Sequence, residues 1–272
     1  MVSVKRWSWV AALLLAGCVI QFSAQNDYEE IFGFDGFSVV RIVNVDGDIS
    51  LRGMETGDVK LCGTAFAMGR TDADARANLR LARLDVNIDI TELILKFDPP
   101  RDKIGLVDLR LDRLGTLPLE AGVTVTVEDG DLVMEDLEGA LTLKTGKGDI
   151  SVTGGGTSIV SAVADDGDVS VEAEGEIVVK SGGQAHVLAG GVDGRPLDAE
   201  TDGESIHVEI PLQNFEISCY PDGGNIEISE SLEAGFAQEL GDGLIRYVRG
   251  TGDKKITLRS NGGPILIQLY QP

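Results

Sequence analysis

Most of the chain alternates between apolar and polar residues, which is the period of strands that bury one face. The alternation is unbroken through residues 84–90, 107–111 and 123–127. Glycine and aspartate bound most of these runs, and both residue types favour turns. The pattern therefore predicts an all-β protein built from many short strands.

One segment departs from this alternation and predicts a short helix. Residues 72–83, DADARANLRLAR, are rich in Ala, Leu and Arg, which are good helix formers. Thr71 stands directly before them, and threonine is a favourable N-cap. We expect one helix over residues 72–83.

A repeat becomes visible from residue 123 onward. Apolar pairs begin every nine residues, at Val123, Leu132, Leu141, Ile150 and Ile159. Similar turns recur at about twice that interval, at Asp129-Gly130-Asp131, Lys147-Gly148-Asp149 and Asp166-Gly167-Asp168. A unit of about eighteen residues therefore contains two strands and two turns.

Two architectures fit a unit of this length. In a parallel β-helix, or β-solenoid, each unit is one two-strand coil and equivalent residues stack. In an antiparallel β-sandwich or meander each unit is a hairpin, for which Asp-Gly is a strong signal. The segments that follow two of the turns, 149–152 (DISV) and 168–171 (DVSV), are nearly identical. This sameness favours the solenoid.

The first residues predict export. Lys5 and Arg6 precede an apolar run over 7–20, which is too short to span a bilayer and fits an export signal. The run contains Leu15-Ala16-Gly17-Cys18, which resembles the lipobox of bacterial lipoproteins. The resemblance implies cleavage before Cys18, lipid on the Cys18 sulfur and attachment to a membrane, the outer membrane in a diderm because Val19 is not aspartate.

These observations predict three parts of the chain. Residues 1–17 are expected to be a cleaved lipoprotein signal peptide, and residues 18–36 a lipidated tether. Residues 37–272 are expected to form the β-solenoid domain, with 37–119 as a possible N-terminal capping part.

The net negative charge of the chain argues against one class of partner, nucleic acids. The chain has 45 Asp and Glu against 23 Lys and Arg, a formal net charge of −22. Nucleic-acid binding depends on a basic surface, so we expect no nucleic-acid partner. The negative excess suits a β protein that must resist edge-to-edge association.

The search for catalytic or metal-binding motifs predicts no catalytic residue, no metal site and no cofactor. The two histidines, His186 and His207, do not form a His-x-x-x-His motif, and alternation places His207 on the surface of a strand. The stacked turn residues Asp131, Asp149 and Asp168 are expected to be solvated, with calcium binding between coils as the alternative.

Cys62 and Cys219 are the cysteines that remain beyond Cys18. They are 157 positions apart, which places them several coils apart in a solenoid. A disulfide needs Cα atoms within about 7 Å. We expect two free buried thiols, with a disulfide as the alternative.

A wider resemblance covers residues 37–269. The segment Thr116–Gly122 (TLPLEAG), the strand 123–127 and the Gly-Asp copies after it resemble a family of exported bacterial proteins of unknown function named "putative adhesin". Residues 71–90 resemble the early segment of that family. The resemblance implies a β-helical fold and no shared catalytic residues.

The sequence thus predicts a non-enzymatic, lipid-anchored cell-envelope protein, periplasmic or surface-exposed. Its β-solenoid surface would bind a protein or glycan partner in an adhesin-like way. A periplasmic scaffold or envelope-signalling component is the alternative. A polysaccharide-active enzyme is disfavoured, because aromatic platforms for sugars are scarce and both tryptophans, Trp7 and Trp9, lie in the predicted signal.

Overall fold

The structure is a computed structural model. It describes residues 22–33, 38–55, 57–80, 84–89, 91–97, 109–155, 159–190, 195–211, 214–229, 236–239, 244–250, 252 and 254–270. The predicted signal peptide and Leu15, Ala16, Gly17 and Cys18 lie outside these residues.

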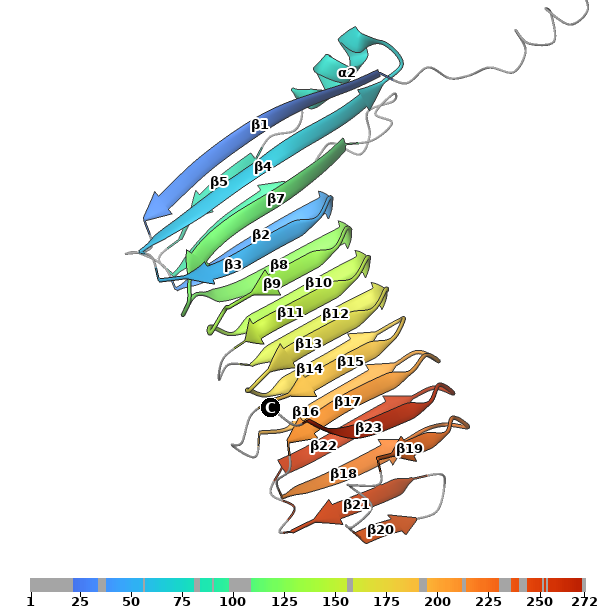
Figure 1. Ribbon diagram of the computed structural model, residues 1–272. Helices are drawn as coiled ribbons and strands as arrows, with labels where there is room; N and C mark the ends of the chain where they lie inside the picture. Colours follow the sequence, from blue (N-terminus) through green and yellow to red (C-terminus); the bar gives the residue numbers. More distant parts are fainter. Residues whose placement is uncertain are drawn as a thin grey trace, which may run out of the picture.

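The described chain is all-β with one short helix, and its strands form two long sheets (Figure 1). Sheet A contains, in spatial order, β1 (Phe22–Gly33), β4 (Asp58–Gly69), β7 (Leu109–Pro118), β3 (Ile49–Met54), β9 (Leu132–Glu135), β11 (Ile150–Gly155), β13 (Val169–Ala173), β15 (Ala185–Ala189), β17 (Ile206–Pro211), β23 (Ile265–Tyr270) and β19 (Ile226–Ile228).

Sheet B runs alongside it. It contains, in spatial order, β20 (Phe236–Glu239), β21 (Ile245–Arg249), β18 (Phe215–Tyr220), β22 (Lys254–Ser260), β16 (Leu197–Thr201), β14 (Ile177–Ser181), β12 (Val160–Asp166), β10 (Leu141–Lys147), β8 (Gly122–Asp129), β2 (Val39–Asp46), β6 (Glu92–Phe97) and β5 (Leu84–Ile88).

Through the middle of the molecule the chain visits the two sheets in turn. From β8 to β17 every strand in sheet B is followed by one in sheet A, and strands two apart pair in parallel. Leu141, for example, pairs with Val123 on one side and with Val160 on the other. The repeat predicted from the sequence is therefore confirmed as parallel strands in register, and the antiparallel meander is wrong for this part.

The core lies between the sheets and explains the alternation. Leu141 and Leu143 of β10 are buried, whereas Thr142 and Lys144, which alternate with them, are exposed. On sheet A, Val152 and Val171 are buried in the same way. Burial of one such side chain contributes about 1.5–3 kcal/mol, so the stack of apolar rows holds the two sheets together.

Three of the four sheet ends are antiparallel, and the prediction of parallel strands is wrong there, whereas β19 pairs with β23 in parallel at the remaining end of sheet A. At the N-terminal end β4 pairs with both β1 and β7, and β5 pairs with β6, in antiparallel register. At the C-terminal end β21 pairs antiparallel with β18 and β20. Of these pairs, β5–β6 and β20–β21 are consecutive in the chain and need no crossover connection, whereas β1–β4, β4–β7 and β18–β21 join strands that are separated by other strands.

The polar segment expected as part of the tether over residues 18–36 instead forms a strand in its described part. β1 pairs with β4 along its whole length. Its polar side chains have partners on β4: Thr64 donates to Asp27 at 2.8 Å, and Lys60 pairs with Glu29 at 2.7 Å. The polarity that suggested a tether is that of a strand at the edge of the sheet.

The predicted helix is confirmed over most of its length. Helix α2 spans Asp72–Leu79, and the Thr71 side chain accepts a hydrogen bond from the backbone N–H of Asp74. Ala75 is its buried residue, and the helix contacts β4 and β1. Residues 81–83 of the prediction lie outside the described residues.

The last two strands of the chain, β22 and β23, insert between earlier strands of the two sheets. β22 lies between β16 and β18, and β23 lies between β17 and β19, all in parallel (Figure 1, red between orange strands). Segments about sixty residues apart thus become neighbours, as at Asp198 and Thr257. This insertion interrupts the sequence order that the repeat alone would suggest.

Candidate functional site

The acidic turns form a ladder, as predicted, and their carboxylates bind backbone. The Oδ1 of Asp48 accepts a hydrogen bond from the N–H of Asp131 at 3.0 Å, and Asp131 accepts one from Asp149 at 2.8 Å. Asp149 accepts from Asp168 at 2.8 Å, and Asp168 accepts from Gln184 at 2.7 Å. Each carboxylate therefore ties one turn to the next.

A second ladder of buried hydroxyls supports the same turns from inside. The Thr145 hydroxyl lies 2.9 Å from the carbonyl oxygens of both Gly130 and Lys147. Ser181 lies 2.7 Å from the Gly167 carbonyl and 3.0 Å from that of Gln184. Thr201 and Ser260 contact turn carbonyls in the same way. These turns have a structural role that accounts for their carboxylates and hydroxyls.

A different cluster gathers the two histidines of the chain. His186 lies on β15 and His207 on the neighbouring strand β17, at paired positions. Glu209 follows on β17, two residues on and therefore on the same outward face. The flanking residues Val187 and Val208 are buried, so core packing fixes the backbone that carries all three side chains.

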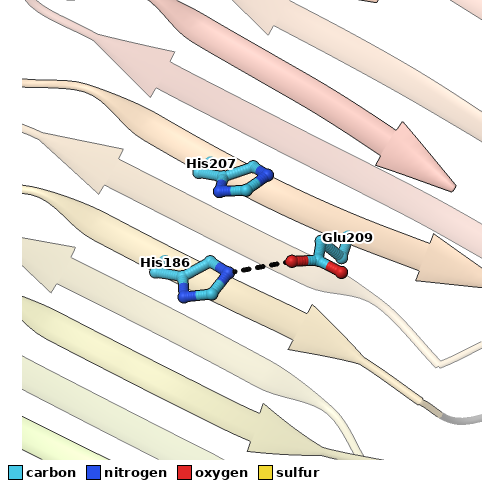
Figure 2. Close-up of side chains that lie close together, drawn as sticks. All are labelled: His186, His207 and Glu209. Atoms are coloured by element: carbon cyan, nitrogen blue, oxygen red, sulfur yellow. Dashed lines mark hydrogen bonds and ion pairs between the residues drawn. The ribbon is translucent and has the colours of Figure 1, made fainter. Parts of the chain in front are cut away.

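The three side chains lie close together (Figure 2). The imidazole rings are stacked, with centroids 4.7 Å apart and planes inclined by 15°. The Nε2 of His186 lies 3.2 Å from Oε1 of Glu209. One nitrogen or oxygen atom from each of the three residues lies within 4.8 Å of the others.

Accessibility differs within this cluster. The side chains of His186 and Glu209 are 45% and 25% exposed. The Nε2 of His207, by contrast, is buried and has no hydrogen-bond partner among the residues that the structure describes. The cluster thus offers two accessible ligand atoms beside a buried polar atom.

The sequence reasoning placed His207 on the outward face, and this is confirmed by the burial of Ile206 and Val208 on either side. It did not bring His207 together with His186 and Glu209. The sequence does contain a signal for this pair, because His186 and His207 lie about one repeat unit apart. Each directly follows the apolar residue that begins its strand, Ala185 or Ile206, and these two residues are paired. Aligning the repeat units would have revealed the pair.

The two remaining cysteines are free and lie far apart in the fold. Cys62 is half-buried on β4, near one end of sheet A, and Cys219 is buried on β18, near the opposite end of sheet B. Burial raises the pKa of the Cys219 thiol to about 12. The expectation of two free thiols holds in the structure, although Cys62 is less buried than predicted.

The outward face of sheet B carries ion pairs between neighbouring strands. Lys180 pairs with Glu200 at 3.3 Å, and Arg259 pairs with Asp198 at 2.6 Å. Near the C-terminal end, Glu216 accepts hydrogen bonds from Arg246, at 2.9 Å, and from Lys255. These bonds, that from Arg246 first, lower the pKa of the Glu216 carboxyl to about 2.

Comparison with known proteins gives structural neighbours only. The sequence matches no protein-family model and no curated protein. Among solved structures, a "putative cell adhesion protein" from Clostridium sporogenes is 12% identical and has a TM-score of 0.39, covering 91% of this chain and 100% of that one. A "putative adhesin" from Bacteroides fragilis is 13% identical with a TM-score of 0.40, covering 90% of this chain and 97% of that one.

A third such structure, a "putative adhesin" from Parabacteroides merdae, is 10% identical and has a TM-score of 0.29, covering 89% of this chain and 96% of that one. TM-scores and identities this low assign neither family nor function, and we therefore argue function from the residues of this chain. In the described part, no helix has the length and apolar character required to cross a bilayer.

Proposed function

We propose that the protein is a non-enzymatic, lipid-anchored component of the bacterial cell envelope. Its two sheets form a β-solenoid, and it presents the outward face of sheet A to a protein partner outside the cell, in an adhesin-like way. The anchor is lipid on Cys18, after removal of residues 1–17. The choice of sheet A is supported by a row of small side chains that leads to the cluster of His186, His207 and Glu209.

This row crosses the parallel strands of sheet A. Ser50, Val133, Ser151 and Ser170 occupy paired positions on β3, β9, β11 and β13. None of the four is charged, and neighbouring strands are about 4.8 Å apart. Short side chains in register leave an even surface that another protein can approach closely at little desolvation cost.

The outward face of sheet B has a comparable uncharged row, formed by Thr124, Thr142, Ser161 and Val178, but several ion pairs lie beside it. Lys144, Lys180 and Arg259 stand there with acidic partners, Asp165, Glu200 and Asp198. A partner that covered this face would have to desolvate those charges, which is unfavourable unless each is paired again.

Sheet A has ion pairs too, near its N-terminal end, where Arg52 meets Glu135 and Asp136. Its uncharged row, however, leads from Ser170 to the paired residue His186 and so to His207 and Glu209, whose polar groups can bind side chains of a partner. We therefore choose sheet A as the binding face.

The exposed chemistry of sheet A does not resemble an enzyme site. His186, His207 and Glu209 stand on the outward side of a sheet, and the His186 side chain is 45% exposed. Enzymes generally enclose the reacting groups and exclude water from them. The absence of tryptophan from residues 18–272 also disfavours a glycan partner, because sugar-binding surfaces generally use aromatic platforms.

Site-specific photocrosslinking in cells tests the choice of face. A photoreactive amino acid is placed at Ser151 or Ser170 on sheet A, and at Ser161 on the outward face of sheet B as the matched control. We expect Ser151 and Ser170 to give an adduct of one defined mass and Ser161 to give none. Equal adducts from both faces, or adducts from Ser161 alone, would contradict the proposal.

The anchor is tested separately. Membrane fractions of cells that make the wild type or Cys18→Ser are compared, with Cys62→Ser as the matched control. We expect Cys18→Ser to leave the membrane fraction, because two or more acyl chains are needed for stable attachment, and Cys62→Ser to remain there. Membrane association of Cys18→Ser equal to that of the wild type would refute the lipid anchor.

A further inference from the structure

We propose that His186, His207 and Glu209 bind a divalent transition-metal ion of the zinc class on the outward face of sheet A. Two imidazoles and one carboxylate form a common ligand set for such ions, with the remaining position open to water or a partner's side chain. This site is independent of the proposed envelope function, and either can fail without the other.

The distances place the ligand atoms near a coordination sphere. A tetrahedral zinc ion with bonds of about 2.0–2.1 Å holds its ligand atoms about 3.3 Å apart. The Nε2 of His186 and Oε1 of Glu209 are already 3.2 Å apart. The three ligand atoms all lie within 4.8 Å of one another, so a contraction of at most about 1.5 Å completes the triangle.

Side-chain rotation alone supplies that contraction. The rings are nearly parallel, at 15°, so their nitrogen lone pairs do not yet converge on one point. The His186 side chain is 45% exposed and its ring can turn toward Glu209. The backbone stays in place because Ala185, Val187 and Val208 are buried in the core.

The surroundings of His207 favour a bound ion. A buried polar atom without a hydrogen bond costs free energy, and the Nε2 of His207 is such an atom among the described residues. Coordination would satisfy this nitrogen. Glu209 is held beside the two rings by its contact with His186, and its charge offsets part of the charge of the ion.

The ligand types also determine which ions fit. Imidazole nitrogen suits zinc, nickel and copper ions, whereas calcium and magnesium prefer sites built from oxygen atoms. The net charge of −22 attracts every cation loosely. Selectivity for Zn²⁺ over Ca²⁺ therefore separates this site from diffuse binding to the acidic surface.

The test is a Zn²⁺ titration of the purified full chain, prepared without a histidine tag, in competition with a chromophoric chelator. We expect one equivalent to bind and millimolar Ca²⁺ not to displace it. His186→Gln and His207→Gln should each weaken binding at least about tenfold. Glu209→Gln should weaken it less, because the amide oxygen can still coordinate. No saturable Zn²⁺ binding, or affinity unchanged in both histidine variants, would overturn the proposal.

Two controls remove the other candidate ligands. Cys62→Ser tests the half-buried thiol, and Asp149→Asn tests the acidic ladder; both should bind Zn²⁺ as the wild type does. If either lost the tight equivalent, the site would lie elsewhere and the proposal would be wrong.

A measurement on the wild type covers the case in which a variant fails to fold. The chain has only two histidines, so its NMR spectrum contains two sets of imidazole resonances. We expect both sets to shift together and saturate at one equivalent of Zn²⁺. Shifts in neither set, or in only one, would overturn the site as proposed.

Discussion

The Oδ1 of Asp149 accepts a hydrogen bond from the backbone N–H of Asp168, 2.8 Å away on the next turn of the stack. Asp149 in turn donates its own N–H to Asp131. One residue thus links two neighbouring turns, with backbone on one side and side chain on the other. This arrangement explains why an aspartate recurs after glycine in the repeat.

Removing one link of this ladder should lower stability. We expect Asp149→Ala to reduce the free energy of unfolding by about 1–2 kcal/mol, because a charge-assisted hydrogen bond is lost. Asp149→Asn should cost less, since its amide oxygen can still accept. Urea unfolding measures both, with Glu138→Ala, another exposed carboxylate, as control. Equal effects of Asp149→Ala and Glu138→Ala would contradict the structural role of the ladder.

The glycine of the same turn is required by space and by backbone conformation. Gly148 has φ 125°, and a Cβ there would lie 2.4 Å from the carbonyl oxygen of Gly130. We expect Gly148→Ala to destabilise the protein by about 1–3 kcal/mol or more. Gly190→Ala is the control, because its Cβ would meet only ordinary contact with Glu174 at 3.8 Å. Similar melting temperatures for the two variants would contradict this account.

The ion pairs of Glu216 predict that the free energy of unfolding falls at low pH. The folded pKa of Glu216 is about 2, below the ordinary value of 4.5, so its contribution is complete above about pH 4.5 and is lost as the pH falls toward 2. Urea midpoints of wild type and Glu216→Gln should therefore differ most near pH 6 and converge as the pH falls through about 2. A difference that stays constant with pH would contradict it.

The two described cysteines should react at different rates. Burial raises the pKa of the Cys219 thiol to about 12, and the thiolate is the reactive form. In the native protein we expect an alkylating reagent to modify Cys62 and to reach Cys219 only after unfolding. Peptide mass spectrometry with and without urea measures this. Native labelling of Cys219 at the rate of Cys62, or a disulfide-linked peptide, would refute it.

The sequence predicts the central stack well because local rules determine it. Alternation at Leu141–Thr145 assigns one face to the core, and the turns at Gly130, Gly148 and Gly167 set the repeat length. Stacking then requires only that equivalent residues pair, as Leu141 pairs with Val160. The parallel register follows from the repeat itself.

The ends and the histidine cluster depend on contacts between distant parts of the chain. Nothing in the local pattern of β22 places it between β16 and β18, because that position depends on which strand edges are left open. The polar segment of β1 became a strand through its partner β4. His186 and His207 meet only after the units are aligned, and the small slips in the repeat obscured that alignment.

The most direct test of the central proposal is protease accessibility of an epitope-tagged copy in intact cells, with permeabilised cells as control. An adhesin-like envelope protein that presents sheet A to an external partner should be digested in intact cells. Digestion only after permeabilisation would contradict that account and would favour a periplasmic scaffold instead.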